Sequence, residues 1–344
     1  MKEGNTFLPS EWHTQSAIQL TWPHAQTDWN YMLDEVNSCF LAIAKEVAKR
    51  QLLLIVTPEV DTVRTLLQKA GVVMEHVRLF EAQSNDTWAR DHGAITLLKD
   101  GIPQIIDFKF NGWGLKFASN HDNLITCQLH QAGILQANYI NELNFALEGG
   151  GIESDGNGTL LTTSECLLSP NRNGAFSKQE ISAYLTELFK LKQILWLDYG
   201  YLAGDDTDSH VDTLARLCPN DTIAYVQCLD TSDEHYEALR AMESQLKTFK
   251  TLAGDPYRLI ALPMADAIYF EGERLPATYA NFLIMNDTIL YPTYNQAIND
   301  AAAERALQEA FPGYTLVGID CNALIKQHGS LHCVTMQFPE NVIK

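Results

Sequence analysis

The sequence contains no Cys-x-x-Cys pair, no apolar run long enough to span a bilayer and comparatively few basic residues. Its seven cysteines are odd in number and widely scattered, so they predict neither a disulfide framework nor a zinc site. The net charge of −19 argues against binding to nucleic acid and is compatible with a cationic ligand, although surface acidity more often serves solubility. Residues 1–15 lack the apolar segment of a secretory leader. We therefore expect a cytoplasmic protein that does not bind membranes.

Linkers are also missing. A length of 344 residues would by itself suggest two domains. However, no Pro/Gly/Ser-rich or low-complexity segment interrupts the pattern of elements described next. We therefore expect residues 1–344 to form a single catalytic domain.

From Asp91 onward the chain repeats one order of elements: a polar motif, two strands, a helix and a strand. Hydrophobic patterning predicts these sets at 94–98, 103–107, 123–131 and 137–140; at 152–154, 159–163, 178–190 and 194–199; at 211–218, 222–228, 233–252 and 257–263; and at 280–285, 288–294, 296–311 and 314–319. After Cys333 only one strand remains. The N-terminal strand 17–22, helix 33–50 and strand 52–57 supply the missing elements, followed by a helix at 59–70 and a strand at 77–80.

The second strands of three sets resemble one another in sequence. Each begins with a threonine (Thr159, Thr222 and Thr288), and these lie roughly 60–65 positions apart, the spacing of a supersecondary repeat. Closing such repeats into a ring removes exposed sheet edges, as in propellers. We therefore predict an α/β fold, a fivefold pseudosymmetric propeller of ββαβ repeats around a central active-site pocket, with one repeat completed by both termini.

The polar motifs all enter the first strand of a repeat, so equivalent positions should converge on the axis of the ring. On a strand, His210 and Asp212 would share one face. His332 and Cys333 would point to opposite faces, so a proton carrier for Cys333 must come from elsewhere. The converging side chains are then Asp91, Glu148, His210, Asp212 and Cys333.

A thiol, a histidine and several carboxylates suit the hydrolysis of a guanidinium group. Carboxylates alone disfavour a thiolate, whereas a cationic substrate favours it. The planar guanidinium presents N–H donors that match a pair of carboxylates. The thiolate would attack the central carbon, and the histidine would protonate the departing ammonia and later deprotonate water. The intermediate would be a covalent thiouronium.

Each feature also has a structural explanation. Cys333 alone could be a small buried apolar residue, Asp91 could pair with Arg90 at the surface, and the glycines after Glu148 could form a turn. His210 alone is more often a core or surface residue. Residues 204–208 resemble a calcium loop but lack its later glycine and distal glutamate. The structural explanations do not account for the shared position of these motifs within the repeat.

Five separate motifs resemble the agmatine deiminases, members of the peptidyl-arginine deiminase-like family in the guanidine-modifying (pentein) superfamily of fivefold propellers. These are Trp88-Ala-Arg-Asp91-His-Gly, Glu148-Gly-Gly-Gly-Ile, Thr159-Leu-Leu-Thr-Thr-Ser-Glu-Cys-Leu-Leu with Asn171-Arg172-Asn173, Asp208-Ser-His210-Val-Asp212, and His332-Cys333. Trp22-Pro23-His24 and Tyr279-Ala-Asn281-Phe match as well, so the resemblance covers nearly the whole chain.

The resemblance implies a hydrolase that converts agmatine to N-carbamoylputrescine and ammonia, with no metal and no cofactor. Cys333 would be the nucleophile and His210 the acid and base. Asp91 and Asp212 would clamp the guanidinium, with Glu148 beside them, and Trp88 would line the substrate pocket. The chain departs from the family's usual residues at 328–330 and at 92, where it has His-Gly-Ser and His. Both positions bear on the far end of the substrate.

Two other hypotheses remain. The same chemistry could act on peptidyl-arginine or another substituted arginine. Alternatively, the chain could be a non-catalytic binding module, because the fivefold fold also occurs in a ribosome anti-association factor without the cysteine. A zinc deaminase is disfavoured, because the chain has no His-x-Glu with Pro-Cys-x-x-Cys. A homo-oligomer is left open.

Overall fold

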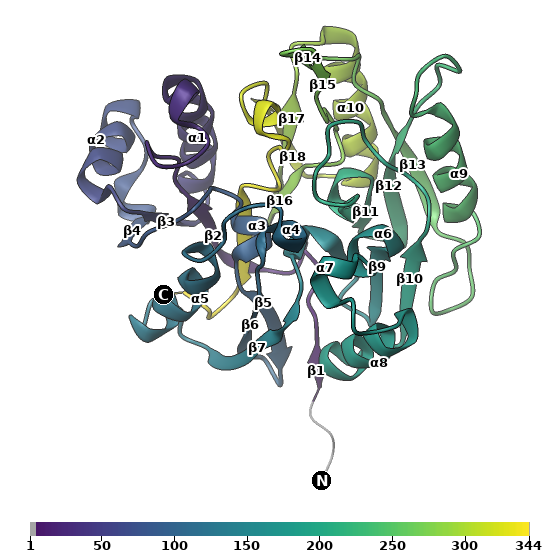
Figure 1. Cartoon of the computed structure of the whole chain (residues 1–344), viewed down its shortest axis with the longest axis horizontal. Helices are drawn as coiled ribbons and strands as arrows, with labels where there is room; N and C mark the ends of the chain where they lie inside the picture. The colour runs from purple at the N-terminus through teal and green to yellow at the C-terminus, as the bar shows by residue number, and fades with distance from the viewer. Residues whose placement is uncertain (1–4, 344) are drawn as a thin grey trace. The chain divides into compact units, whose positions relative to one another are not determined.

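The computed structural model describes residues 5–343 and contains two compact units of mixed α/β structure (Figure 1). The first unit is formed by Thr14–Gly149 and by the C-terminal segment from His332 onward. The second is formed by Thr6–His13 and Gly150–Leu331. Among the described residues, no helix is both long and apolar enough to cross a membrane.

Both ends of the chain build one sheet of the first unit, in the strand order β19-β2-β3-β4. Its elements in chain order are β2 (Gln15–Thr21), α1 (Leu33–Ala48), β3 (Leu52–Thr57), α2 (Val60–Ala70), β4 (Val77–Glu81) and β19 (Thr335–Pro339). β19 is antiparallel to β2, and β2, β3 and β4 are parallel. The apolar run of β3 is typical of a strand covered on both faces, and Leu54 and Val56 join Phe338 in the core.

The second sheet of this unit contains the first complete repeat. Its elements are β5 (Ile95–Lys99), β6 (Ile102–Lys109), α5 (Asp122–Gln131) and β7 (Asn138–Ala146). Asp100 and Gly101 connect β5 to β6 with φ values of 52° and 79°, the conformation of a two-residue hairpin. β6 then runs parallel to β7.

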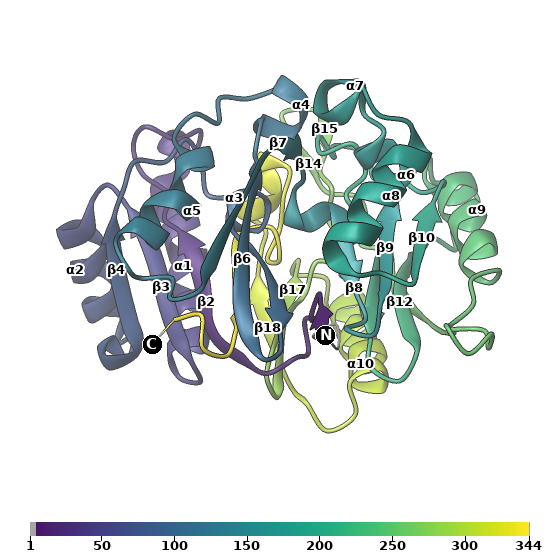
Figure 2. The same cartoon turned by 90° about the horizontal axis from the view of Figure 1, so that it is seen from below.

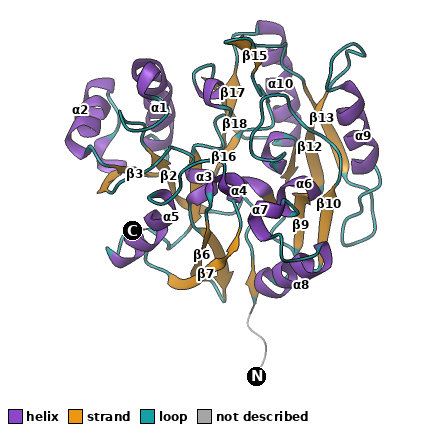
Figure 3. Cartoon of the chain, viewed as in Figure 1, coloured by secondary structure: helices purple, strands orange, loops and turns teal. Residues whose placement is uncertain are grey.

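The second unit contains three more repeats, each with its own sheet and one long helix (Figures 2 and 3). Its main elements are β8 (Ile152–Ser154), β9 (Thr159–Thr163), α8 (Lys178–Phe189), β10 (Gln193–Leu197), β11 (Ala215–Cys218), β12 (Thr222–Gln227), α9 (Tyr236–Leu246), β13 (Arg258–Pro263), β16 (Leu283–Met285), β17 (Thr288–Thr293), α10 (Ala297–Ala310) and β18 (Thr315–Asp320). In every repeat the first two strands are antiparallel and the last two are parallel. The α9 helix contacts both β10 and β12.

Short elements carry the connections. They are β1 (Thr6–Phe7), η1 (Asn30–Met32), η2 (Met74–His76), α3 (Ala89–His92), α4 (Gly112–Leu115), η3 (Gly149–Gly151), α6 (Ser164–Leu167), α7 (Pro170–Asn173), η4 (Val211–Thr213), β14 (Tyr269–Phe270), β15 (Glu273–Arg274) and η5 (Leu324–Gln327). Three of these, α3, η3 and η4, together with the turn before β19, occupy the positions where the polar motifs were expected.

The predicted order of strands and helices is confirmed in all five repeats, including the one built from both termini. Several boundaries are wrong, and one of them is the end of the strand expected at 137–140, because β7 continues to Ala146. The strand expected at 211–218 begins only at Ala215, because the chain first makes the 3₁₀ turn η4. The helix expected at 233–252 is shorter, Tyr236–Leu246. The closed ring and the single domain stay predictions.

Candidate active site

All six predicted site residues are buried, and they belong to both units. Those of the first unit are Trp88, Asp91, Glu148 and Cys333, and those of the second are His210 and Asp212. Five of them stand in the connections that lead into the first strand of a repeat: Asp91 before β5, Glu148 before β8, His210 and Asp212 before β11, and Cys333 before β19. The shared phase inferred from the sequence is therefore present in the structure.

Three of the motif segments adjoin one another within the first unit. The backbone N–H of Arg90 donates to the carbonyl oxygen of Cys333 at 3.1 Å. A Cβ on Gly149 would lie 2.3 Å from the carbonyl oxygen of Arg90, so only glycine allows this approach. The backbone segments that carry Asp91, Glu148 and Cys333 are thus brought together around Arg90.

Asp91 receives a hydrogen bond that the sequence did not reveal. The indole Nε1–H of Trp113 donates to Asp91 Oδ2 at 3.0 Å, and both side chains are buried. Such a donor favours the charged carboxylate and restricts its rotation. The only signal in the sequence was the pair of glycines around Trp113, which indicates an unusual turn.

The loop before Trp88 is anchored by a second tryptophan. The rings of Trp29 and Trp88 lie 5.7 Å apart, and Trp29 Nε1 donates to Asp86 Oδ1 at 2.9 Å. Burial raises the pKa of Asp86 to about 6. Asp122 accepts the backbone N–H of Asn85 at 2.7 Å and so holds the same loop from helix α5. Trp88 is therefore fixed in place by contacts on more than one side.

Cys333 does not lie on a strand, contrary to expectation. Residues 331–334 form a turn and β19 begins at Thr335, whose N–H and hydroxyl donate to the carbonyl oxygen of His332 at 3.0 and 2.9 Å. The strand alternation predicted for His332 and Cys333 is therefore wrong. The turn forms because Thr335 caps the chain before it enters the sheet.

His210 and Asp212 are not on a strand either. His210 precedes the 3₁₀ turn η4, which contains Asp212, so the inference from a shared strand face is wrong. The backbone N–H of His210 donates to Thr207 Oγ1 at 3.1 Å, and Thr213 Oγ1 donates to the His210 carbonyl at 2.8 Å. The position of His210 is set by these backbone contacts.

The two residues before His210 have strained backbones. Asp208 and Ser209 have φ values of 64° and 59°, in the left-handed region that L-residues disfavour. The buried side chain of Arg172 compensates, since it pairs with the Asp208 carboxylate and donates to the Thr207 carbonyl at 2.7 Å. Backbone strain of this kind is frequent at functional sites.

Asp212 lies near a fixed positive charge. Asn281 Nδ2 donates to Asp212 Oδ2 at 3.2 Å. Burial acts to lower the pKa of Arg216, but the carboxylates of Glu153, Glu11 and Asp212 raise it above its ordinary value. Arg216 therefore stays charged near Asp212. This role of Arg216 was not predicted from the sequence, in which the one signal is an arginine inside a buried strand.

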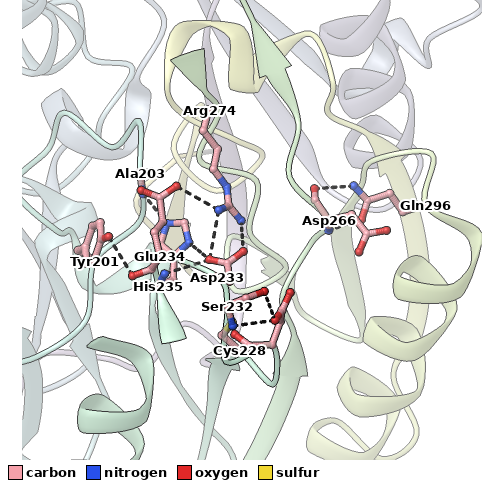
Figure 4. Close-up of polar contacts among 11 residues, drawn as sticks. Tyr201, Ala203, Cys228, Ser232, Asp233, Glu234, His235, Asp266, Arg274 and Gln296 are labelled. Atoms are coloured by element: carbon pink, nitrogen blue, oxygen red, sulfur yellow. Dashed lines mark hydrogen bonds and ion pairs between the residues drawn. The ribbon is translucent and has the colours of Figure 1, made fainter. Parts of the chain in front are cut away.

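A polar network holds the loop that leads toward His210 (Figure 4). Asp233 accepts from Arg274 Nη2 and from His235 Nδ1, each at 2.7 Å, and these bonds hold the pKa of Asp233 below its ordinary value although burial acts to raise it. His235 Nε2 in turn accepts the backbone N–H of Ala203 at 2.7 Å. On the other side of the loop, His328 Nδ1 donates to the Gly204 carbonyl at 2.7 Å. The unusual His328 thus has a structural role in this loop.

The acidic stretch 204–208 is part of the same loop. Asp205 accepts hydrogen bonds from the Thr207 hydroxyl at 2.6 Å and from the Ser209 N–H at 2.8 Å. These bonds make Asp205 a local cap for the strained segment.

The expectation that the chemistry requires neither metal nor cofactor stays a prediction.

Comparison with known proteins identifies a consistent group of relatives. The family model of the Porphyromonas-type peptidyl-arginine deiminases matches residues 7–339. A curated protein of Legionella pneumophila (strain Paris), named "Putative agmatine deiminase", is 31% identical over 345 residues, which cover 99% of this chain and 97% of the relative.

Solved structures agree. The "Putative Arginine Deiminase" from Porphyromonas gingivalis is 52% identical with a TM-score of 0.94, over 99% of this chain and 100% of that one. A Cys-to-Ser variant of C. jejuni agmatine deiminase with substrate bound is 36% identical with a TM-score of 0.90, over 98% of this chain and 97% of that one.

Proposed function

Because this chain belongs to the Porphyromonas-type peptidyl-arginine deiminase family, we propose that it hydrolyses agmatine to N-carbamoylputrescine and ammonia. The observation that supports this most is the shared phase of its buried polar residues, since Asp91, Glu148, Asp212 and Cys333 all precede the first strand of a repeat. Similarity to agmatine deiminases over nearly the full chain is consistent with it. The reaction makes the enzyme a hydrolase of linear amidines in polyamine synthesis, acting in the cytoplasm.

In this proposal residues 1–344 form one catalytic domain, in which the five ββαβ repeats close into a ring around the substrate. Asp91 and Asp212 clamp the guanidinium from its N–H edges, with Glu148 beside them. Trp88 lines the pocket. The orientation of both clamp carboxylates by neighbours, Trp113 for one and Asn281 for the other, supports this role because a planar cation requires fixed acceptors.

Cys333 then acts as the nucleophile. Its thiolate forms a bond to the guanidinium carbon, and the imidazolium of His210 gives a proton to the departing nitrogen, so that ammonia leaves and a thiouronium remains on sulfur. The neutral imidazole next takes a proton from water. The resulting oxygen nucleophile forms the C–O bond and the C–S bond breaks, which restores the thiolate. The remaining O–H proton passes to solvent as the neutral urea product is released.

A second candidate substrate is arginine within a peptide or another substituted arginine. The description of the matched family favours it, as does a solved structure described as a "putative peptidyl-arginine deiminase", which is 44% identical with a TM-score of 0.93. The chemistry at the guanidinium would be the same. Only the contacts between the protein and the substrate tail would differ.

Ammonia release from a panel of guanidino compounds tests the proposal. The panel contains agmatine, free arginine, an N-acetylated arginine amide, a peptide with internal arginine and an agmatine with a methylated guanidinium. We expect agmatine to be fastest, free arginine slower because its α-carboxylate meets an acidic protein, and the methylated compound slowest. The Cys333→Ser variant, which lacks the proposed nucleophile, is the inactive control. If the N-acetylated arginine amide or the peptide is hydrolysed fastest, the second candidate substrate replaces agmatine.

A further inference from the structure

The loop between β6 and α5 contains a left-handed turn. Gly112, Trp113, Gly114 and Leu115 have φ values of 65°, 54°, 82° and 68°. The side chain of Asn111 closes this turn, since its Oδ1 accepts the N–H of Gly114 at 2.9 Å. Consecutive left-handed residues are disfavoured for L-amino acids, and two of these four are not glycine. The turn therefore costs free energy that the rest of the structure must offset.

Of the two non-glycine side chains in this turn, only one is buried. Leu115 is 73% exposed, whereas Trp113 is 6% exposed. The Trp113 ring packs edge to face against Phe110 at 5.0 Å and Phe117 at 5.5 Å. A Cβ at position 112 would lie 2.2 Å from the carbonyl oxygen of Phe117, so the turn also requires glycine at that point. The conformation serves to fix the direction of a single indole.

The indole of Trp113 contacts the carboxylate of Asp91. Its Nε1–H donates to Asp91 Oδ2 at 3.0 Å in a buried setting. Buried tryptophans usually find a partner for this N–H, but a backbone carbonyl would be enough and would not require strain. A strained segment that directs a donor at a carboxylate of the candidate site is better explained by function.

We infer that Trp113 is a positioning residue for the Asp91 carboxylate, fixing its plane and its charge for a guanidinium substrate. This inference rests on the proposed function. A bidentate clamp needs both carboxylate oxygens in the plane of the guanidinium. The donor on Oδ2 restricts rotation of the carboxylate and favours its ionised form before substrate arrives, which reduces the ordering required on binding.

Trp113→Phe is the direct test, because it keeps an aromatic ring between Phe110 and Phe117 while it removes the N–H together with part of the indole. We expect kcat/KM to fall roughly 10- to 100-fold, the loss expected for a hydrogen bond to a charged group. The acidic limb of the kcat/KM–pH profile should also move to higher pH, because a carboxylate without its donor holds its proton longer.

Trp196→Phe is the matched control. Trp196 lies in the second unit, and its Nε1 donates to Ser182 Oγ at 3.2 Å, outside the candidate site. The same atom is therefore deleted without touching Asp91. Both kcat/KM and the acidic limb should remain as in the wild type. Thermal unfolding of both variants measures any loss of stability separately.

The activity is measured on whichever guanidino compound the wild type turns over fastest. A Trp113→Phe enzyme whose kcat/KM stays within twofold of wild type, or which loses activity with an unmoved acidic limb, would overturn the inference while leaving the proposed function intact. A wild type inactive on every guanidino compound would instead overturn the proposed function itself. Binding of the same compounds to Cys333→Ser, with and without Trp113→Phe, would then decide whether the indole orders the carboxylate.

If Trp113→Phe does not fold, Asn111→Ala replaces it. This variant keeps the indole and removes the contact that closes the turn, at the N–H of Gly114. We expect a smaller fall in kcat/KM with a shift of the acidic limb in the same direction. An unchanged pH profile in a folded Asn111→Ala enzyme would also count against the inference.

Discussion

His235 accepts the backbone N–H of Ala203 through Nε2 at 2.7 Å while its Nδ1 is bound to the carboxylate of Asp233 at the same distance. A nitrogen can accept a hydrogen bond only if it carries no proton, so Nδ1 must hold the proton of a neutral ring. Arg274 also binds this carboxylate, and its Nη2 donates to Asp233 Oδ2 at 2.7 Å (Figure 4). His235 therefore holds the loop that leads toward His210 only as the neutral tautomer with its proton on Nδ1.

Protonation of His235 should release Ala203 and destabilise the protein. Burial and the nearby Arg274 lower the pKa of His235 below its ordinary value, although Asp233 acts in the opposite direction. Because the unfolded chain then binds the proton more readily, the stability from this group is complete above the ordinary pKa of histidine, about 6.5, and is lost as the pH falls below it.

His235→Gln provides the comparison, because glutamine offers an acceptor for Ala203 and does not titrate. Urea unfolding at pH 7.5 and 5.5 should show a greater loss of stability on acidification for the wild type than for the variant. Parallel losses in the two proteins would show that His235 is not responsible.

Asp91→Asn and Asp212→Asn should each yield a folded protein that has lost activity by at least about 10³-fold. Each change removes one charged acceptor, so the guanidinium is bound more weakly and is poorly oriented toward sulfur. Circular dichroism and steady-state ammonia release measure the two effects. A variant with near wild-type turnover would remove that carboxylate from the proposed site.

Cys333 should carry a covalent intermediate. Acid quench of the wild type during turnover of agmatine should give an intact-protein mass increased by one amidino adduct, and peptide mapping should place it on Cys333. Cys333→Ser should bind agmatine without forming the adduct, because a serine hydroxyl is hardly ionised at this pH. The other six cysteines are internal controls. An adduct on Cys321 or Cys218, or full activity in Cys333→Ser, would refute the mechanism.

Arg216→Met should destabilise the fold strongly. Arg216 is fully buried and binds Glu153, Glu11 (2.7 Å) and the carbonyls of Ala280 (2.9 Å) and Phe282 (2.7 Å). Its removal would leave two buried carboxylates without a cation, a loss of about 3–5 kcal/mol in unfolding free energy.

Arg240→Met is the matched control for Arg216→Met. The Arg240–Glu237 pair is exposed on helix α9, and exposed pairs contribute at most about 1 kcal/mol. Urea unfolding at one pH measures both variants. A loss from Arg216→Met no larger than that from Arg240→Met would mean that the buried network does not stabilise the second unit.

The sequence by itself determined the order of elements and the identity of the predicted site residues. Apolar runs such as Leu52–Thr57 act locally, so hydrophobic patterning was enough to place the elements of all five repeats. The same local reasoning placed Asp91 and Glu148 just before strands, because their motifs preceded apolar runs, but it wrongly put Cys333 on its strand.

Only the tertiary structure decided the local conformation and the hydrogen-bond partners of those residues. His210 and Asp212 enter a 3₁₀ turn instead of a strand because Thr207 and Thr213 cap the chain there, and patterning carries no signal for a turn of three residues. Trp113 meets Asp91 across 22 positions, and Arg216 meets Glu153 across 63. Hydrogen bonds between residues so far apart depend on the packing of sheets and helices, which no local pattern encodes.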